Sequence, residues 1–395
     1  MMKTLNDINF ENKKALVRVD FNVPVENDKV TDNTRIKAAL PTINKILKEG
    51  GSVVLMSHRG RPKGKNEKLS MQIIVPEVER VLDKEVKFVD DVIGDKVVKA
   101  INNLKPGEII LLENLRFYPE ETKGDENFAK ELAKNGEIYV NDAFGTAHRA
   151  HASTAIVAHY FDKDHKALGK LMEQEVKSIN KALNEGEKPI TAIIGGAKVS
   201  SKIDVIKNLL NKVDNLIIVG GMAYTFLKAL GNKIGDSIVE DDKIDVAKEI
   251  MEEAKNKGVN LILPVDFVVA DAFSPDAQIQ IVPADKIPYG WQGLDIGPET
   301  LKNISQIIEN SKTIIWNGPA GVFEFEKFAK GTEGIGKAIG KATEKGAYSL
   351  VGGGDSVAAV QKLGLENKIS YISTGGGVLL DMLAGKKLPA LEALK

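Results

Sequence analysis

The sequence predicts an α/β protein of two domains, each built on a parallel sheet, and two observations carry this prediction. Short apolar runs rich in β-branched residues alternate along the whole chain with longer amphipathic stretches, which is the pattern of repeated strand–helix units. The chain has 395 residues, enough for two domains that each bury a core. Length and alternation together favour two parallel-sheet domains over one.

Eleven short runs that are mainly apolar and rich in β-branched residues have the composition of strands. Five lie in the first half, at 15–20, 52–58, 87–91, 108–114 and 137–143. Six lie in the second half, at 190–196, 215–221, 260–266, 313–319, 348–354 and 369–375. We expect one parallel sheet from each set.

A single helix is expected between the two sets of strands. Apolar residues recur there at helical spacing, and Gly186 and Pro189 follow as stop signals. These apolar residues are Leu168, Leu171, Met172, Val176, Ile179 and Leu183. The helix, at 168–186, would connect a first domain at 1–167 to a second at 187–387.

Composition excludes several classes of function. All seven arginines lie in the first 149 residues, yet residues 1–165 carry 26 basic and 26 acidic side chains, so no basic half exists to bind nucleic acid. The chain has no cysteine, which excludes disulfides and thiolate catalysis. Charges interrupt every apolar run before membrane-spanning or signal-peptide length, so we expect a cytoplasmic protein.

Several of the arginines are candidates for binding an anion, because a guanidinium binds carboxylate or phosphate through paired hydrogen bonds. Arg61 and Arg149 lie in glycine-bearing loops at strand ends, and Arg116 follows a strand by two residues. Arg35 falls in the first turn of a helix that Asp32 or Asn33 would cap; a cation there opposes the helix dipole, so either an anion binds beside it or it is a surface side chain.

The other three arginines have structural interpretations. Arg80 lies three residues after Glu77 in an amphipathic stretch and is expected to form an exposed ion pair. By strand alternation Arg59 points away from its neighbours, which favours a supporting role. Arg18 is either the buried partner of a carboxylate or part of a positive rim; the sequence leaves both open.

Ligands of parallel sheets bind beyond the carboxyl ends of the strands, so the residues after each strand are the candidate site. In the first half they are Asp20, Phe21 and Asn22, then His58, Arg59, Gly60 and Arg61, then Glu113, Asn114 and Arg116, then Asn141 to His151. In the second half they are Gly195, Gly196, Gly220, Gly221, Asn317, Gly318, Gly352 to Asp355 and Gly375 to Gly377.

Lys198 and Lys202 follow a glycine-rich strand end and are expected on one face of a helix, where helix N–H groups and two ammonium groups would cradle phosphate. The stretch 331–338 has Walker spacing but ends in Ala338 and follows a helix-like segment, so it is not a P-loop. Asp355 is either a helix cap or a ligand of phosphate-bound Mg²⁺.

The histidines favour an anion site over a metal site. His148 and His151 lie three residues apart in an arginine-flanked loop without a third ligand, so a metal pair is not expected. His58 is placed to donate to an anion.

Eight motifs run in order along the chain and resemble the phosphoglycerate kinase family. They are VRVDFNVP at 17–24, SHRGRP at 57–62, LLENLRF at 111–117, NDAFGTAHRAHAS at 141–153, IIGGAKVSSKI at 193–203, LPVDFV at 263–268, WNGPAGVFE at 316–324 and GGGDS at 352–356. Ser201 departs from the family, in which many members have Asp, and Ser356 stands where many have Thr.

The resemblance implies two Rossmann-like domains that face each other across a cleft and are joined by a hinge helix, with residues 388–395 returning to the first domain. It implies reversible phosphoryl transfer between ATP and the carboxylate of 3-phosphoglycerate, with Mg²⁺ as cofactor, in a monomer. The residues that it implies for the acid substrate are Asp20, Phe21, Asn22, Arg35, His58, Arg59, Gly60, Arg61, Arg116 and Arg149. Those that it implies for the nucleotide are Gly196, Ala197, Lys198, Lys202, Gly220, Gly221, Gly293, Asn317, Pro319, Glu324, Gly353, Gly354, Asp355 and Ser356.

Within this resemblance Glu324 would bind the ribose, Asp355 the metal, and Arg35 and Lys198 the phosphoryl group in transfer. The acceptor is a carboxylate that is already ionised at neutral pH, so no general base is required. Two rivals share the plan of two α/β domains. A nicotinamide-dependent dehydrogenase requires a GxGxxG strand end, and 334–340 has the wrong spacing. A solute-binding protein would not need Lys198 and Lys202 together, and no signal peptide is expected.

Overall fold

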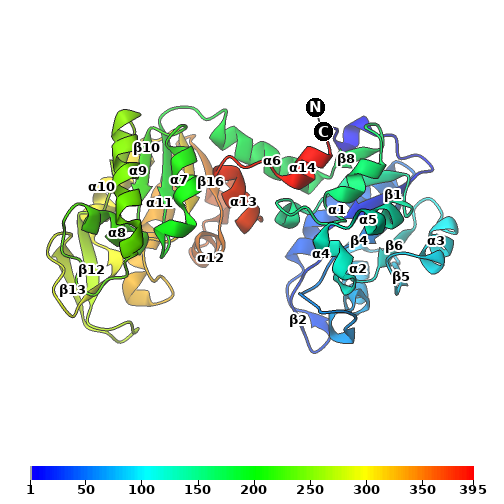
Figure 1. The fold of residues 1–395 in the computed structure, drawn as a ribbon, viewed down its shortest axis with the longest axis horizontal. Helices are drawn as coiled ribbons and strands as arrows, with labels where there is room; N and C mark the ends of the chain where they lie inside the picture. Colours follow the sequence, from blue (N-terminus) through cyan, green and yellow to red (C-terminus); the bar gives the residue numbers. More distant parts are fainter. Residues whose placement is uncertain (1) are drawn as a thin grey trace. The chain divides into compact units, whose positions relative to one another are not determined.

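The computed structural model describes residues 2–395, which form two compact units. Unit 1 runs to Val176 and takes in Lys387–Lys395, and unit 2 is Lys177–Lys386. The chain passes from one to the other within helix α6 (Lys170–Leu183), the helix that the sequence predicts between the two sets of strands (Figure 1). No helix of the described residues is long and apolar enough to cross a membrane.

Unit 1 contains a six-stranded sheet in the order β5-β6-β4-β1-β7-β8, with every neighbouring pair parallel. Its strands are β1 (Lys14–Arg18), β4 (Ser52–Met56), β5 (Lys87–Val89), β6 (Ile109–Leu112), β7 (Ile138–Asn141) and β8 (Lys166–Leu168). Its helices are α1 (Thr34–Lys48), α2 (Val75–Leu82), α3 (Asp95–Asn102), α4 (Pro119–Lys123), α5 (Glu126–Ala133) and α14 (Pro389–Ala393). A two-stranded hairpin, β2 (Val25–Glu26) and β3 (Lys29–Val30), precedes α1.

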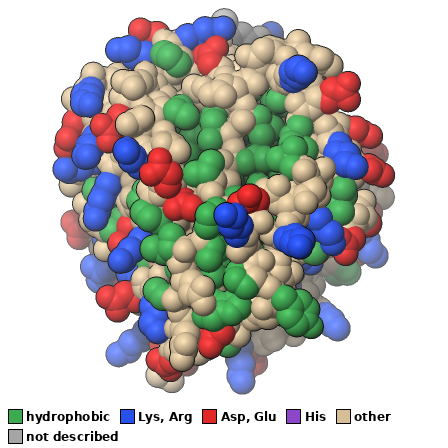
Figure 2. Space-filling view, turned by 90° about the vertical axis from the view of Figure 1, so that its left-hand side faces the viewer, with side chains coloured by type: hydrophobic (Ala, Val, Ile, Leu, Met, Phe, Trp, Pro, Cys, Tyr) green, Lys and Arg blue, Asp and Glu red, His purple; other side chains and the backbone are tan. Residues whose placement is uncertain are grey.

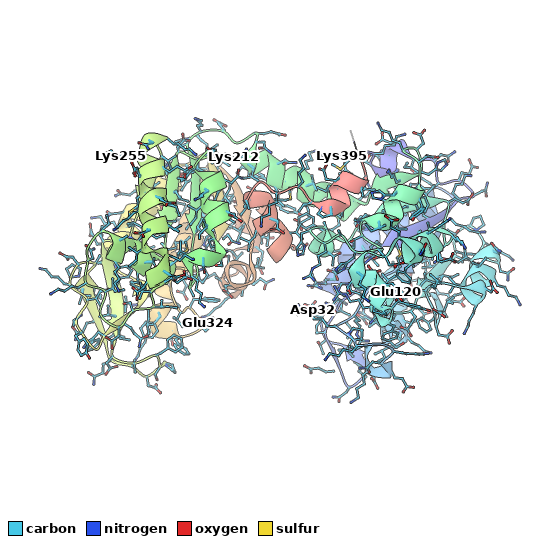
Figure 3. All side chains as sticks on the ribbon, in the orientation of Figure 1. Asp32, Glu120, Lys212, Lys255, Glu324 and Lys395 are labelled. Carbon is cyan, nitrogen blue, oxygen red and sulfur yellow. The ribbon has the colours of Figure 1, made fainter. Side chains whose placement is uncertain are left out.

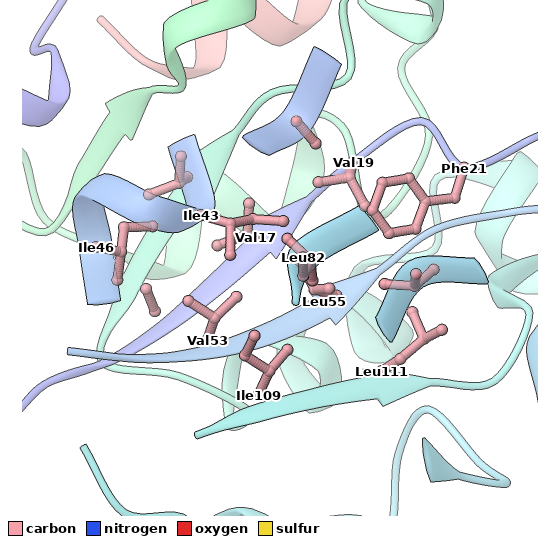
Figure 4. Packing of buried hydrophobic residues seen from close by; sticks show 14 of the residues in the cluster. Val17, Val19, Phe21, Ile43, Ile46, Val53, Leu55, Leu82, Ile109 and Leu111 are labelled. Carbon is pink, nitrogen blue, oxygen red and sulfur yellow. The ribbon is translucent and has the colours of Figure 1, made fainter. Parts of the chain in front are cut away.

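The core of unit 1 lies between the sheet and the helices that cover it. Val17 of β1 and Val53 of β4 are fully buried beside Ile43 and Ile46, which project from one face of α1 (Figure 4). Branched apolar side chains fill such a face because they bury area in few rotamers. The packed face leaves the carboxyl ends of the strands free to carry polar residues.

The C-terminal segment belongs to unit 1, although it comes last in the chain. The N–H of Ala390 in α14 donates to the carbonyl of Ala147 at 3.1 Å, and the ammonium of Lys166 donates to the carbonyl of Ala393 at 2.9 Å. The second of these bonds links α14 to β8, the edge strand of the sheet.

Unit 2 contains a second parallel sheet of six strands, in the order β11-β10-β9-β15-β16-β17. Its strands are β9 (Ile190–Ile194), β10 (Asn215–Ile218), β11 (Asn260–Ile262), β15 (Thr313–Asn317), β16 (Tyr348–Val351) and β17 (Tyr371–Ile372). Its helices are α7 (Ile203–Leu209), α8 (Met222–Ala229), α9 (Ile244–Asn256), α10 (Pro298–Glu309), α11 (Lys330–Glu344), α12 (Gly354–Lys362) and α13 (Gly376–Leu383). All eleven predicted strands are therefore confirmed.

Unit 2 also contains an antiparallel sheet that the sequence analysis does not predict. It has the order β13-β12-β14, formed by β12 (Asp266–Ala270), β13 (Ile279–Pro283) and β14 (Gln292–Ile296). The edge strand β13 is largely exposed, and apolar side chains lie among charged ones on this face of unit 2 (Figure 2). At the start of β13, Gln278 and Gln280 alternate with Ile279 and Ile281, whereas the parallel strands are mostly apolar.

Two local predictions have clear outcomes. The stretch 331–338 lies inside α11, and the N–H of Gly331 in its first turn donates to Asp295, so this stretch is a helix and not a phosphate-binding loop, as the sequence analysis expects. Arg80 and Glu77 form the expected ion pair, with 2.6 Å between the guanidinium and the carboxylate.

Candidate active site

In unit 1 the residues that follow β1 and β4 are tied into one network. The guanidinium of Arg35 lies 3.2 Å from Asp20 Oδ1 and donates to the carbonyl of Asn22 at 2.9 Å. The side-chain oxygen of Asn22 accepts from the N–H of Gly60 at 2.9 Å, and the carbonyl of Gly60 accepts from Arg116 at 2.9 Å. Three predicted strand-end segments and the first turn of α1 thus meet at one edge of the sheet.

Asn114 joins the loops that carry Arg59 and Arg116. Its Oδ1 accepts from the N–H of Arg59 at 3.2 Å and of Arg116 at 3.0 Å, and its Nδ2 donates to the carbonyl of Arg59 at 2.8 Å. The guanidinium of Arg59 donates to the carbonyls of Ser70 at 2.7 Å and Lys68 at 2.8 Å. Arg59 therefore holds the loop at 66–71, as the strand alternation indicates, and its guanidinium is engaged within the chain.

A cavity of about 700 Å³ lies at this edge of unit 1 and collects positive charge. Arg61, Arg116 and Arg149 line it together with Lys63 and His151. Of the described residues that line it, none is acidic. Such a cavity suits a small ligand with several negative charges.

The crowding of cations changes the titration of two groups in this cavity. Burial, with the positive charges of Arg18 and Arg149, lowers the pKa of Arg116 to about 10. Burial, with Arg116 and Arg18, lowers the pKa of His151 to about 4. His151 is therefore neutral at physiological pH, whereas the arginines keep their charge.

Phe21, Arg18 and His58 of unit 1 are buried and do not line the cavity. Phe21 is fully buried in the core, so its side chain supports the loop after β1. Arg18 is also fully buried, and its guanidinium lies 3.1 Å from Nδ1 of His58. The prediction left Arg18 as a buried partner or a rim residue, and its burial decides for the first.

In unit 2 a cavity of about 470 Å³ lies at the carboxyl ends of the parallel strands. The predicted residues that line it are Gly196, Ala197, Gly220, Gly221, Gly293, Pro319, Glu324 and Asp355. A Cβ on Gly293 would lie 2.0 Å from the hydroxyl of Tyr224, so this wall requires glycine. Glu324 is exposed on the loop between β15 and α11 (Figure 3).

Further residues line this cavity that the sequence analysis does not identify. They are Tyr224, Ile238, Phe273, Gln292, Leu294, Ala320, Gly321 and Val322. Most are apolar, and several come from the antiparallel sheet and its loops. An apolar residue carries no sequence signal that distinguishes a cavity wall from a core, so only the fold reveals them.

Lys198 and Lys202 do not lie on one helix, and this prediction is wrong. A 3₁₀ turn (Val199–Ser201) separates them, and α7 begins only at Ile203. Lys198 is exposed before the turn. Lys202 is half-buried after it, and its ammonium donates to Asn317 Oδ1 at the end of β15. The ammonium groups of Lys198 and Lys202 therefore lie in different surroundings. Ser201 does not connect them, because its hydroxyl donates to the backbone carbonyl of Lys198.

Two hydrogen bonds and one left-handed glycine shape the loop before α12. Asn317 donates to the carbonyl of Gly352 at 2.9 Å, and the N–H of Gly318 donates to Ser356 at 2.7 Å. Gly353 has a φ of +98°, and a Cβ there would lie 2.7 Å from Asn317 Nδ2. No side chain caps α12, so the N–H groups of its first turn can bind an anion.

The chain offers one carboxylate at this loop. Asp355 is exposed in the first turn of α12 and lines the cavity of unit 2. Within residues 2–395 no group of three or more His, Cys, Asp or Glu side chains could hold a metal ion. A single carboxylate fits Mg²⁺ that is bound mainly through nucleotide phosphates and water.

Comparisons with known proteins agree with the sequence motifs. The family model described as phosphoglycerate kinase matches residues 5–386. A phosphoglycerate kinase of Porphyromonas gingivalis is 52% identical over 99% of this chain and 100% of its own length. A cytosolic phosphoglycerate kinase 3 of Arabidopsis thaliana is 52% identical over 99% of this chain and 97% of its own length.

Solved structures agree as well. The phosphoglycerate kinase of Coxiella burnetii has a TM-score of 0.93 and 40% identity, covering 100% of this chain and 99% of its own. That of Pyrococcus horikoshii has a TM-score of 0.81 and 33% identity, covering 100% and 98%. The chain therefore belongs to the phosphoglycerate kinase family, the glycolytic kinases that transfer a phosphoryl group from 1,3-bisphosphoglycerate to ADP, which yields ATP.

Proposed function

We propose that unit 1 binds the phosphoglycerate and that unit 2 binds the nucleotide. The observation that carries this assignment is the cavity of unit 1, in which Arg61, Arg116, Arg149 and Lys63 meet without an acidic side chain among the described residues that line it. A small acid with a phosphate and a carboxylate matches this excess of cations.

The cavity of unit 2 has the complementary chemistry. Its walls are glycine backbone and apolar side chains such as Phe273 and Val322, which suit a flat base. Glu324 at the rim would accept from ribose hydroxyls. Lys202 and the first turn of α12 would bind the phosphates, and lysine with helix N–H groups explains why this unit needs no arginine.

The reaction requires positioning and charge neutralisation more than acid–base catalysis. The attacking group is a carboxylate, so no side chain has to remove a proton from it. Arg35 from unit 1 and Lys198 from unit 2 would stabilise the negative charge on the oxygens of the phosphoryl group in transfer. Lys198 is exposed and has no hydrogen bond from its ammonium in the described part of the chain, which leaves it free for this task.

Mg²⁺ would accompany the nucleotide, with Asp355 as its one protein carboxylate. Bound there, the ion would neutralise phosphate charge. Because acceptor and donor are assigned to different units, we further propose that the units close about α6 before transfer and exclude water from the acyl phosphate. We place the protein in the cytoplasm as a monomer, in keeping with relatives that are named cytosolic.

The assignment is tested by separating the two binding events. ATP consumption in a coupled assay should depend on both 3-phosphoglycerate and Mg²⁺. In calorimetry, Arg149→Ala should weaken 3-phosphoglycerate binding at least tenfold, by about 1.4 kcal/mol or more, and leave the Kd of ADP unchanged. Arg80→Ala, which removes an exposed arginine of the same unit, is the matched control. A change in the Kd of ADP with an unchanged Kd of 3-phosphoglycerate would overturn the assignment.

A further inference from the structure

A chain of buried polar groups lies behind His58. Arg18, at the end of β1, is fully buried, and all of its hydrogen bonds stay inside unit 1. Its Nε donates to Ser153 Oγ at 2.8 Å, one terminal nitrogen donates to the carbonyl of Val19, and the other lies 3.1 Å from Nδ1 of His58. Arg18 therefore acts on a ligand only through other side chains.

Glu121 of α4 is the carboxyl group connected to Arg18 through Ser153. Burial raises the pKa of Glu121, whereas the charge of Arg18 and the hydrogen bonds from Ser153 favour its ionised form. Its side chain is fully buried, and its Oε1 accepts from Ser153 Oγ at 2.8 Å and from the N–H of Ser153 at 3.1 Å. A guanidinium cannot accept a hydrogen bond, so the hydroxyl of Ser153 accepts from Arg18 and donates to Glu121. The order of the chain is thus Glu121, Ser153, Arg18, His58.

The geometry determines which ring nitrogen of His58 carries hydrogen. Because Arg18 only donates, Nδ1 of His58 is the acceptor, and the hydrogen of the neutral ring is on Nε2. Within residues 2–395 no hydrogen bond is made by Nε2, and it is not among the buried polar atoms that lack a partner. Nε2 is therefore the nitrogen that remains for a ligand.

The groups around His58 keep it neutral. Burial, followed by the positive charges of Arg18, Arg116 and Arg35 and by His151, holds the pKa of His58 well below its usual range. Protonation of Nδ1 would also set two donors against each other at 3.1 Å. The ring is thus a neutral donor at physiological pH.

We propose that Glu121 and Ser153 are positioning residues of the acid-substrate site, which act through Arg18 to hold His58 as an Nε2–H donor toward an oxygen of the phosphoglycerate. The inference rests on the proposed function, which places His58 beside that substrate. Without the carboxylate, Arg18 loses the larger of the two carboxylate interactions that favour its buried charge, and Asp20 alone remains. The contact between Arg18 and Nδ1 of His58 then loosens. In part of the molecules the hydrogen moves to Nδ1, so that Nε2 faces the anion without a hydrogen to donate.

The wild-type protein provides the first test and needs no variant. Long-range ¹H–¹⁵N spectra distinguish a bare from a protonated ring nitrogen, and the His58 signals among the five histidines are identified by their loss in His58→Asn. We expect a bare Nδ1 and a protonated Nε2 from pH 6 to pH 8. A protonated Nδ1, or titration of the ring in this range, would refute the inference.

Glu121→Gln keeps the shape of the side chain and removes its charge, and Glu120→Gln removes the same charge one residue away. We expect Glu121→Gln to raise the KM for 3-phosphoglycerate about fivefold, the worth of one hydrogen bond, with kcat little changed, and to mix the His58 tautomers. Ser153→Ala should act in the same direction, and Glu120→Gln should change neither readout.

Two outcomes separate this inference from the proposed function. If His58→Asn raises the KM for 3-phosphoglycerate and folded Glu121→Gln alters neither that KM nor the tautomer, the substrate site stands and the positioning chain is wrong. If His58→Asn leaves the KM unchanged, the placement of His58 beside the substrate is wrong. Should Glu121→Gln fail to fold, the wild-type spectrum still decides.

Discussion

We expect the free energy of unfolding of unit 1 to depend on pH through one buried carboxylate, that of Asp142. It directly follows β7, and its Oδ1 accepts from the N–H groups of Leu171 at 2.9 Å and Met172 at 3.3 Å, in the first turn of α6. Its Oδ2 is buried as well, and Thr42 is the side-chain group that favours the ionised carboxylate. Burial raises the pKa of Asp142 from 3.8 to about 6, so the charged form is disfavoured in the folded state.

The magnitude and sign follow from this shift. Between pH 3.8 and about 6 the folded chain keeps the proton on Asp142 while the unfolded chain has lost it, so the free energy of unfolding falls as the pH rises. A shift of this size corresponds to about 3 kcal/mol. Asp142→Asn is neutral at every pH and retains Oδ1 as an acceptor. Its amide group adds an offset that does not depend on pH.

We therefore expect the difference in stability between Asp142→Asn and the wild type to shift by about 2 kcal/mol in favour of the variant between pH 4 and pH 7. The rest of the total falls below pH 4, where the unfolded carboxyl begins to ionise. Urea unfolding followed by far-UV circular dichroism measures this difference. Both tryptophans, Trp291 and Trp316, lie in unit 2, so their fluorescence follows that unit separately.

Asp83→Asn is the control for this experiment. It removes the charge of an exposed aspartate in unit 1, at a left-handed position with a φ of 51° that asparagine also tolerates. Its difference from the wild type should stay nearly flat with pH. If the difference for Asp142→Asn is equally flat, or shifts toward the wild type as the pH rises, the carboxylate is not destabilised by burial and the reasoning fails.

Three further predictions concern the reaction. Lys198→Ala should lower kcat roughly 100-fold or more with a smaller change in KM, because the ammonium is assigned to the transferring group; steady-state kinetics with wild-type kcat would remove Lys198 from that role. Arg61→Lys should weaken 3-phosphoglycerate binding about tenfold through loss of the paired hydrogen bonds, and an unchanged Kd in calorimetry would make Arg61 structural. Gly353→Ala should raise the KM for ATP but not for 3-phosphoglycerate, since its Cβ would lie 2.7 Å from Asn317 Nδ2 at a φ of +98°; equal effects on both KM values would contradict this.

Local sequence patterns are enough for the parallel sheets and for many of the residues at their carboxyl ends. A strand buried on both faces is mostly apolar and rich in β-branched residues, so runs such as 190–194 and 313–317 can be recognised without any knowledge of their neighbours. The polar residues that follow the strands of unit 1 then meet at one edge because parallel strands end on the same side. The bond between Asn22 and Gly60 is one result of this geometry.

Other features depend on contacts that no local pattern contains. The strand β13 is exposed and mixed in composition, and β8 has only three residues, so neither has the signal of a buried strand. The separation of Lys198 from Lys202 depends on the 3₁₀ turn at Val199–Ser201, which the alternation of apolar residues does not encode.

The arginines show most clearly which features follow from the sequence and which depend on the tertiary structure. The sequence by itself determined the two α/β units, the edges at which ligands would bind and the absence of a basic half. Only the tertiary structure decided that Arg18 is buried while Arg61 and Arg149 line a cavity. The reason is that the surroundings of Arg18 come from Ser153, which is 135 residues away, and from Glu121 beyond it, and burial by such distant segments leaves no trace in neighbouring residues.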